Sequence, residues 1–458
     1  MNAQPPQAPP IVPSRFYYVL KLFTEVRPGE SITALLLALN IFLILMGYYV
    51  LKPVREALIL GQGTAELKTY MSALQVVVLA FVVPYYGRLV ARMDRLRVIN
   101  TVTAFFVVCL IVFFALGQAR VPLGIVYFLW IGIFNLMVVA QFWSFANDIY
   151  TKDQGERLFP IVGFGASLGA VFGSRFAGVF IASMGVLDLM LVGAAILVIQ
   201  AALTNYIDRR QARLGGAPAR SVTPPATAAT AAAAAKPPVN AFQMVFKTKY
   251  LLLMAFMLLL ANTVNTTGEY ILGHIVRDAA IEHVGNDSAA VGREIGQFYS
   301  NYFTYVNILG LFLQMFVVSR VVKHLGVPVG VLILPILSMT AYGIAGFIPF
   351  LHAVLGAKVA ENATDYSINN TVRNMLFLPC TREQKYSAKQ VIDSFFVRMG
   401  DVVSAVLVFV CTTFFSLHPR GFAVINVVLG IAWFVMARRI GQEYKALSAS
   451  QQPPAMSA

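Results

Sequence analysis

The feature that most constrains this chain is a series of long apolar segments that recurs from one end to the other. Of its 458 residues, 58% are hydrophobic and 12% are charged, about half the charge of a soluble domain. Many segments reach roughly 20 residues, the length that crosses a bilayer as a helix. In lipid the backbone must satisfy its own polar groups, as a helix does. The sequence therefore predicts an all-α polytopic membrane protein.

Hydropathy predicts twelve transmembrane helices in two groups of six. The first group covers residues 32–52, 67–88, 98–117, 122–146, 158–182 and 185–206, and the second covers 248–273, 296–320, 326–349, 351–376, 388–416 and 421–440. The first apolar segment begins near Ile32, later than in a cleavable signal peptide, so we expect it to be retained as a helix. The three cysteines form no spaced metal or redox motif.

A segment rich in alanine, proline and threonine, residues 215–238, separates the two groups and is typical of a flexible linker. We therefore expect a disordered tail (1–30), a first six-helix bundle (31–206), a linker (207–246), a second six-helix bundle (247–442) and a second tail (443–458). Charged loops recur at corresponding places in both bundles. Two such repeats form the major facilitator arrangement, whose substrate site lies between the halves near the membrane midplane.

The net charge of +14 would suit a nucleic-acid-binding protein. However, the lysines and arginines lie mainly in alternate loops between helices, as the positive-inside rule expects. We therefore expect a lipid bilayer as surroundings and no nucleic-acid partner. The same loops place both termini in the cytoplasm. Separately, we expect a monomer that lies in a bacterial inner membrane.

The tenth predicted helix carries a ladder of polar residues four apart, namely Glu361, Asp365, Asn369 and Arg373. Residues at this spacing share one face of a helix. Ionisable side chains within a membrane face a water-filled pathway or one another. Both interpretations stay open here: a polar stripe that lines a cavity, or internal ion pairs that tie this helix to its neighbours.

The eleventh predicted helix repeats this pattern, with Lys389 four residues before Asp393 and Arg398 three before Asp401. Lys385 and Lys389 lie near its cytoplasmic end. Lysines there often extend to the membrane surface. An interfacial role and a functional role are therefore both open for these two lysines.

The first predicted helix carries Lys52, Arg55 and Glu56 on one face. A kink at Pro53 would turn this charged face toward the central cavity. Alternatively, the charges mark the outer end of the helix and the start of an amphipathic loop. In the seventh predicted helix, Glu269 shares a face with neighbouring asparagine and threonine side chains.

The fifth predicted helix has Gly165, Gly169 and Gly173 four apart, a spacing that permits close helix packing. A phosphate-binding glycine loop would need a preceding strand and a following Lys-Ser/Thr pair, which this stretch lacks. The sequence also shows no nucleophile elbow, metal-ligand spacing or Walker motif. We therefore expect no enzyme activity, no metal and no cofactor.

Three stretches resemble the ATP/ADP translocase family of nucleotide transporters: "YYVLKPVREALIL" (48–60), "FWSFANDIY" (142–150) and "LFLPCTREQKYSAKQVIDSFFVRMGD" (376–401). The last is the most specific, because charge, spacing and helix onset coincide. The resemblance implies a major facilitator fold and exchange of ATP for ADP, with phosphate as a further candidate substrate. It also implies that Arg55 and Lys389 bind the substrate, with Lys52, Glu56, Lys385 and Asp393 close by, and that either Asn265 or Glu269 occupies the family's acidic position in helix seven.

A nucleotide carries several negative charges, so its site needs several cations. Lys52 and Arg55 from one half, facing Lys389 or Arg398 from the other, would hold phosphates. Two other functions stay open. One is a proton-coupled transporter of another solute that uses Glu361 and Asp365, and the other is a membrane assembly or sensor protein that does not transport.

Overall fold

The computed structural model describes residues 25–27, 30–213, 239–347, 351–381 and 383–450. Its N-terminal half contains α2 (Ser31–Gln62), α3 (Ala65–Arg92), α4 (Arg95–Gln118), α5 (Gly124–Ile149), α6 (Lys152–Ser183) and α7 (Asp188–Arg213). Its C-terminal half contains α9 (Val239–Lys247), α10 (Lys249–Val284), α11 (Ser288–Phe312), α12 (Val318–His324), α13 (Gly326–Phe347), α14 (Leu351–Thr364), α15 (Asn370–Met375), α16 (Lys389–Val391), α17 (Val397–Phe415) and α18 (Pro419–Ser450), with π-helical turns η1 (Leu313–Val317), η2 (Asp365–Asn369), η3 (Gln384–Ala388) and η4 (Ile392–Phe396).

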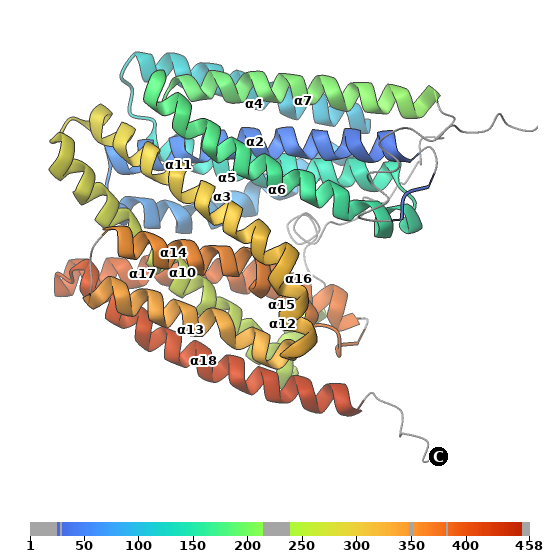
Figure 1. Ribbon diagram of the computed structural model, residues 1–458, viewed down its shortest axis with the longest axis vertical. Helices are drawn as coiled ribbons and strands as arrows, with labels where there is room; N and C mark the ends of the chain where they lie inside the picture. The colour runs from blue at the N-terminus through green and yellow to red at the C-terminus, as the bar shows by residue number, and fades with distance from the viewer. Residues whose placement is uncertain (1–24, 28–29, 214–238, 348–350, 382, 451–458) are drawn as a thin grey trace, which may run out of the picture.

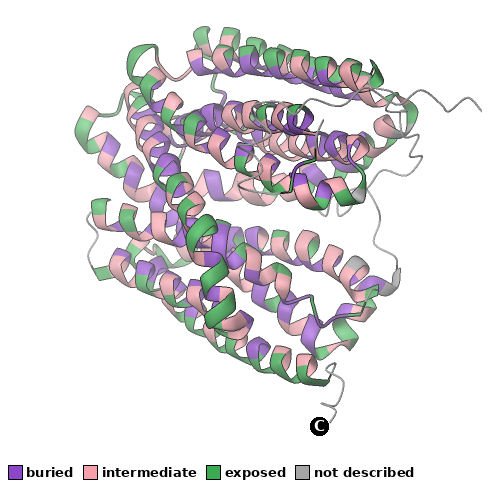
Figure 2. Cartoon of the chain, turned by 45° about the vertical axis from the view of Figure 1, so that its right-hand side comes forward, coloured by how far each residue is buried: buried purple, intermediate pink, exposed green. Residues whose placement is uncertain are grey.

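The two halves form separate bundles whose long helices run in roughly the same direction (Figure 1). We call the end where α2 begins and α7 and α18 finish the proximal end. The end where α2 finishes, near Gln62, is the distal end. Exposed residues dominate the outer faces of both bundles, and buried residues lie toward their interiors (Figure 2).

Eleven helices among the described residues are long and apolar enough to cross a membrane. The expected segment 351–376 is absent from these eleven, and the structure forms it as α14, η2 and α15 in succession. Its charged ladder lowers its hydropathy, and a π-helical turn divides it. The chain is an integral, multi-pass, all-helical membrane protein with two bundles.

Helix α2 extends well beyond the expected 32–52 and continues through Pro53 to Gln62. Its 32 residues span about 48 Å. The segment after Lys52 is therefore helical rather than an amphipathic loop. Lys52 and Glu56 are both buried within it, so these charges are enclosed by the fold.

The glycines of α6 let this helix lie directly against α2. A Cβ atom added at Gly165, Gly169 or Gly173 would lie 2.5, 2.3 and 2.4 Å, respectively, from a backbone carbonyl oxygen of α2. No side chain fits at such a separation. The predicted packing role of this glycine stripe is confirmed, and the contact fixes α2 within the N-terminal half.

Hydrogen bonds between the halves, among the described residues, lie in the middle and distal parts of the bundle. Arg277 donates to the Leu60 carbonyl at 3.1 Å, and the Tyr270 hydroxyl donates to Glu66 at 2.8 Å. Nearer the middle, Asn307 of α11 donates to the Ala170 carbonyl at 3.2 Å. The halves are thus joined at the distal end, and none of these bonds joins them at the proximal end.

At the proximal end, Glu30 links the start of α2 to α6. Both oxygens of its carboxylate accept hydrogen bonds from the Arg157 guanidinium at 3.0 Å, and the Arg27 amide donates a third at 2.9 Å. Burial by itself raises the pKa of Glu30, but these hydrogen bonds outweigh it and lower the pKa below its ordinary value.

The expected linker is shorter in the structure than in the sequence analysis. Helix α7 continues to Arg213, and α9 forms a helix where 239–246 was expected to be linker. Helix α18 likewise continues into the expected tail as far as Ser450. Residues 1–24, 28–29, 214–238 and 451–458, which also belong to the expected tails and linker, lie outside the described residues.

Candidate functional site

Lys52 is a buried cation that has aromatic neighbours in place of a carboxylate. Its side chain lies in α2, and the residue is only 8% exposed. The Nζ atom lies 4.0 Å from the ring centre of Phe303 in α11 and 5.1 Å from that of Tyr49. Among the described residues, no carboxylate lies within 4 Å of this ammonium group. Aromatic faces attract a cation only partly, so the charge of a protonated Lys52 has no matched negative partner there.

Next to Lys52, five side chains form a connected series that crosses from one half to the other. We call Arg55, Glu56, Lys68, Glu269 and Asn362 the central charge chain. Arg55 donates through Nε to Glu56 at 2.9 Å, and Lys68 Nζ lies 2.8 Å from the other Glu56 oxygen. Lys68 Nζ also lies 3.4 Å from Glu269, which accepts a hydrogen bond from Asn362 at 3.3 Å.

The sequence analysis did not identify Lys68. In the structure, Lys68 connects the N-terminal and C-terminal parts of the central charge chain, because it contacts both Glu56 and Glu269. It lies in the first turn of α3, where a lysine would ordinarily reach the membrane surface. In the structure it is 5% exposed, because α3 packs against α10 and places its ammonium group between two carboxylates. The burial of a lysine with two carboxylates depends on tertiary packing, which the sequence does not display.

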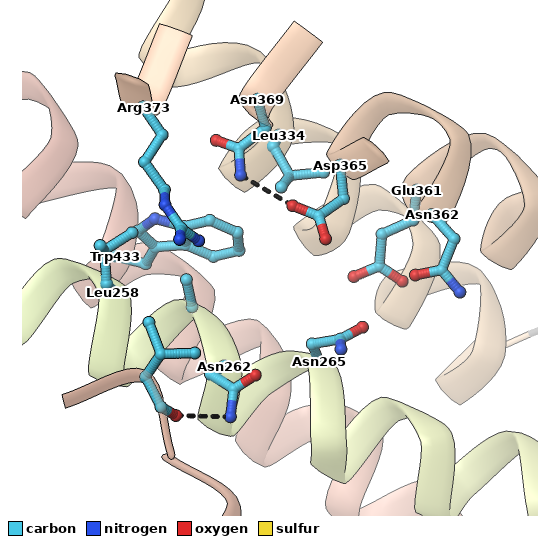
Figure 3. A pocket seen from close by; sticks show the side chains of 12 residues that line it. Leu258, Asn262, Asn265, Leu334, Glu361, Asn362, Asp365, Asn369, Arg373 and Trp433 are labelled. Carbon is cyan, nitrogen blue, oxygen red and sulfur yellow. Dashed lines mark hydrogen bonds between the residues drawn. The ribbon is translucent and has the colours of Figure 1, made fainter. Parts of the chain in front are cut away.

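A polar cavity of about 60 Å³ lies inside the C-terminal half, between α10 and the segment formed by α14, η2 and α15. All four members of the polar ladder line it. Figure 3 shows Glu361 and Asp365 on one side of the cavity, with Asn262 and Asn265 of α10 opposite them. The ladder thus faces a cavity within one half rather than the interface between halves.

Glu361 is also part of a buried ion pair. Its carboxylate lies 2.6 Å from the Lys358 ammonium, and both residues are at most 3% exposed. Ser338 and Tyr342 of α13 donate hydrogen bonds to it at 2.8 and 3.0 Å. The sequence left open whether the ladder residues form internal ion pairs or line a cavity. In the structure Glu361 does both, because it pairs with Lys358 and also lines the cavity.

The structure gathers the remaining expected residues into two further groups in the C-terminal half. Asp393 pairs with Lys389 and, at 3.0 Å, with Arg373. Asp401 accepts hydrogen bonds from Asn262 and Thr266 at 2.8 and 2.7 Å. Arg398 lies 3.6 Å from Asp401 and is about half exposed. Lys385 lies in η3, near the proximal end of this helix series.

The expected meeting of Lys389 with Arg55 does not occur in this conformation. Arg55 lies 24 residues after the start of α2, which corresponds to about 36 Å along the helix. Lys389 lies five residues after the start of η3, about 8 Å along its helix. The two cations therefore stand at different depths in the bundle. Lys389 has its carboxylate partner within its own half.

Among the described residues, no group of three or more His, Cys, Asp and Glu side chains is arranged to hold a metal ion. Among the described site residues, the charged groups instead pair with one another, apart from Lys52, Asp365 and, near the proximal end, Lys385. Such an arrangement can bind and release a charged solute by exchanging partners, with no covalent step.

The model of the TLC ATP/ADP transporter family matches residues 337–444. The ADP,ATP carrier protein 1 of Chlamydia trachomatis serovar D is 23% identical over 361 residues, covering 69% of this chain and 64% of that protein. The corresponding Chlamydia muridarum protein is 22% identical over 358 residues, with the same coverage. This chain thus matches slightly less than two thirds of the length of these relatives.

Solved transporter structures share the fold. A bacterial homologue of the iron transporter ferroportin, in an inward-facing state, superposes with a TM-score of 0.63 at 13% identity, covering 90% of this chain and 98% of that one. The nucleoside transporter NupG gives a TM-score of 0.59 at 11% identity, covering 91% and 99%. The chain is therefore similar to the ATP/ADP transporter family over residues 337–444 and to ADP,ATP carrier proteins over a longer stretch, and it shares its fold with solved transporter structures.

Proposed function

We propose that this transporter exchanges ATP for ADP by alternating access, with a cationic site between its halves. The observation that carries the proposal is Lys52, a buried ammonium group without a carboxylate partner among the described residues. An uncompensated cation inside a membrane protein is costly, and a phosphate group supplies the missing negative charge. The relatives named as ADP,ATP carriers support nucleotides as the substrates.

The central charge chain explains how the site could release a nucleotide as well as bind it. Arg55 is held by Glu56 in this structure. A phosphate that displaces Glu56 would receive a bidentate pair of hydrogen bonds from the guanidinium, whereas Lys52 would act as a point charge. Without a nucleotide the Lys52 charge stays unmatched, which opposes the conformational change of the empty carrier. This predicts strict exchange rather than net uptake.

On the C-terminal side we propose Arg398 as the cation that completes the site, with Glu269, Lys385, Lys389 and Asp393 as neighbouring groups along the pathway. Arg398 lies 14 residues after the start of η3, about 21 Å along the helix. It is therefore deeper than Lys389, and it is about half exposed. Phosphate is a further candidate substrate.

We also propose that the proximal end faces the cytoplasm of a bacterial cell, because the loops there carry the excess of lysine and arginine. The inner membrane and a monomeric state belong to the same proposal. In this orientation the structure is closed on the outer side, where the hydrogen bonds between the halves lie.

The test is uptake of labelled ATP into liposomes that contain the purified full chain, either loaded with ADP or left empty. We expect uptake only into ADP-loaded vesicles. Lys52→Gln should abolish it and Lys52→Arg should retain part of it, because arginine keeps the charge. Lys249→Gln is the matched control, since this lysine is 77% exposed and forms a surface pair with Glu443.

Arg55→Ala and Lys389→Ala separate the two halves of the proposal. Both residues are implied by the family resemblance, but only Arg55 lies beside Lys52 in this conformation. We expect Arg55→Ala to abolish exchange and Lys389→Ala to raise the ATP concentration needed for half-maximal uptake. Absence of ATP uptake by a folded wild-type protein would refute nucleotide exchange. Unchanged exchange after the central charges are neutralised would refute this site.

A further inference from the structure

Asp365 lines the polar cavity of the C-terminal half without a direct salt bridge to any described residue. Its one side-chain hydrogen-bond partner in the described part of the chain is the Asn369 amide, which donates at 2.7 Å. Among the described residues, no lysine, arginine or histidine nitrogen lies within 4 Å of it. The two other charged residues in the cavity lining differ in this respect, because Glu361 pairs with Lys358 and Arg373 pairs with Asp393.

Oxygen-bearing side chains surround the same end of the cavity. Figure 3 shows Asp365, Glu361, Asn362 and Asn265 directed toward a common space. The Asn265 amide has no hydrogen-bond partner among the described residues, although it faces this space from α10. Carboxylate and amide oxygens are ligands for small hard cations. The set therefore suits a cation better than an anion.

The backbone is irregular at this same point. The π-helical turn η2 begins at Asp365 and ends at Asn369, so the two hydrogen-bonded side chains mark its ends. Single π-helical turns within α-helices occur frequently at functional sites. Interrupted transmembrane helices provide coupling-ion sites in transporters. The helix irregularity and the carboxylate without a salt bridge are separate observations that coincide.

The other charged groups near Asp365 do not replace it as the binding group. Helix α13, which packs against η2, contains no charged residue. The basic residues of α12 are exposed, namely Arg320, Lys323 and His324. On α10, Glu269 is engaged by Lys68. A free cation would therefore find at Asp365 a carboxylate without a direct salt bridge.

We propose that this cavity binds a monovalent cation, either a proton or Na⁺, with Asp365 as the charged ligand and Asn265 as a neutral one. Glu361 contributes an oxygen but keeps its charge matched by Lys358. The inference goes beyond ATP/ADP exchange and holds whichever solute crosses between the halves. Binding would neutralise Asp365 inside the C-terminal half, so that movement of the halves carries the cation with it.

The test measures binding directly, in the absence of any nucleotide, with the full chain in lipid nanodiscs. For Na⁺, thermal unfolding is followed as NaCl replaces choline chloride at constant ionic strength. We expect a saturable rise in melting temperature that Asp365→Asn removes, because a ligand that binds only the folded state stabilises it. Asp401→Asn is the matched control, since Asp401 also lies within the C-terminal half but already accepts two hydrogen bonds and has Arg398 at 3.6 Å.

For a proton, the same samples are acidified and infrared difference spectra are recorded. Protonation of Asp365 would give a carboxylic-acid carbonyl band that is absent from Asp365→Asn and present in Asp401→Asn. The Na⁺ response identifies sodium as the cation, and this band without a Na⁺ response identifies the proton. If the wild type shows neither signal, or Asp365→Asn keeps the signal, the proposal is wrong.

A second variant keeps the test valid if Asp365→Asn fails to fold. Asn265→Leu retains the carboxylate and removes only the neutral ligand. It should raise the Na⁺ concentration for half-maximal stabilisation at least severalfold, or shift the pH midpoint of the infrared band. If Asn265→Leu changes neither the Na⁺ concentration for half-maximal stabilisation nor the pH midpoint of the infrared band, Asn265 is not a ligand and the cavity is not the binding site.

Discussion

Removal of the Lys68 ammonium group should weaken the closure of the distal end. Lys68 is held by Glu56 within its own half and by Glu269 across the interface, at 2.8 and 3.4 Å. Only the second contact must break when the halves separate at that end. Lys68→Met keeps much of the side-chain volume and removes the charge. We therefore expect it to shift the equilibrium toward a distal-open conformation.

The size of the shift follows from the distance. At 3.4 Å and an effective dielectric constant of about 20, Coulomb's law gives about 5 kcal/mol. Part of this is offset when the halves separate, because both groups then regain hydration, and Glu269 is already 24% exposed. We expect a net effect of about 1–3 kcal/mol, equivalent to a change of about 5- to 150-fold in the ratio of the two conformations.

Spin-label distances can measure this ratio. With the three native cysteines replaced, one label pair at Gln118→Cys and Asn286→Cys reports the distal end, and another at Arg213→Cys and Lys445→Cys reports the proximal end. All four positions are exposed. In Lys68→Met the distal distance should lengthen and the proximal distance shorten.

Lys249→Met is the control for the distance measurement, because it removes a lysine from an exposed pair worth about 0–1 kcal/mol. That pair lies within one half, so both distance distributions should stay unchanged. Distributions in Lys68→Met that match the wild type would refute the assignment of Lys68 as the closing contact. The same result in a variant with a lower melting temperature would show that its charges serve stability alone.

Two further predictions concern stability. Gly169→Ala should lower the melting temperature, since the new Cβ would lie 2.3 Å from a backbone oxygen of α2 and overpacking costs about 1–3 kcal/mol. Gly163→Ala is the control: a Cβ there would have nothing within 4 Å, so the melting temperature should stay unchanged or rise. Glu30 has a lowered pKa, so its stabilising contact with Arg157 should be present at neutral pH and lost as pH falls through that pKa. Glu30→Gln should therefore lower the melting temperature at neutral pH and flatten its fall in acid, whereas the exposed Glu25→Gln should do neither.

The sequence was most informative where one local property decides the structure. Apolar length placed eleven of the twelve expected helices among those able to span a membrane. Glycine spacing likewise predicted the α6–α2 contact, because only small residues at that period permit such an approach. Helix ends were less well predicted, as α2 shows by continuing ten residues beyond the expected end at Lys52. Pro53 suggested a kink, but the surrounding helices hold the segment in place.

The candidate site was harder to predict because its geometry depends on partners distant in sequence. The sequence places Arg55 beside Glu56, but it does not show that Lys68 occupies the other Glu56 oxygen. It places Asp365 and Arg373 on one helix face, but it does not show that Arg373 has a partner and Asp365 lacks a cationic one. Tertiary packing decides which charged side chain has an oppositely charged partner. In a low-dielectric interior, a charged group without such a partner determines the sign of the ligand that can bind.

The charges of Lys52 and Asp365, neither of which has a salt-bridge partner among the described residues, differ in sign and in location, and this difference separates their proposed roles. Lys52 lies where α2 meets Phe303 of the opposite half, so a solute bound there contacts both halves and its binding depends on their relative position. Asp365 lies in a cavity lined only by the C-terminal half, so occupation of that cavity changes the charge of one moving body. A solute anion and a coupling cation can therefore occupy the protein together without competing for a site. If both proposals hold, Lys52→Gln leaves the cation response intact, and Asp365→Asn leaves the proposed nucleotide binding at Lys52 intact while it alters the pH or Na⁺ dependence of transport.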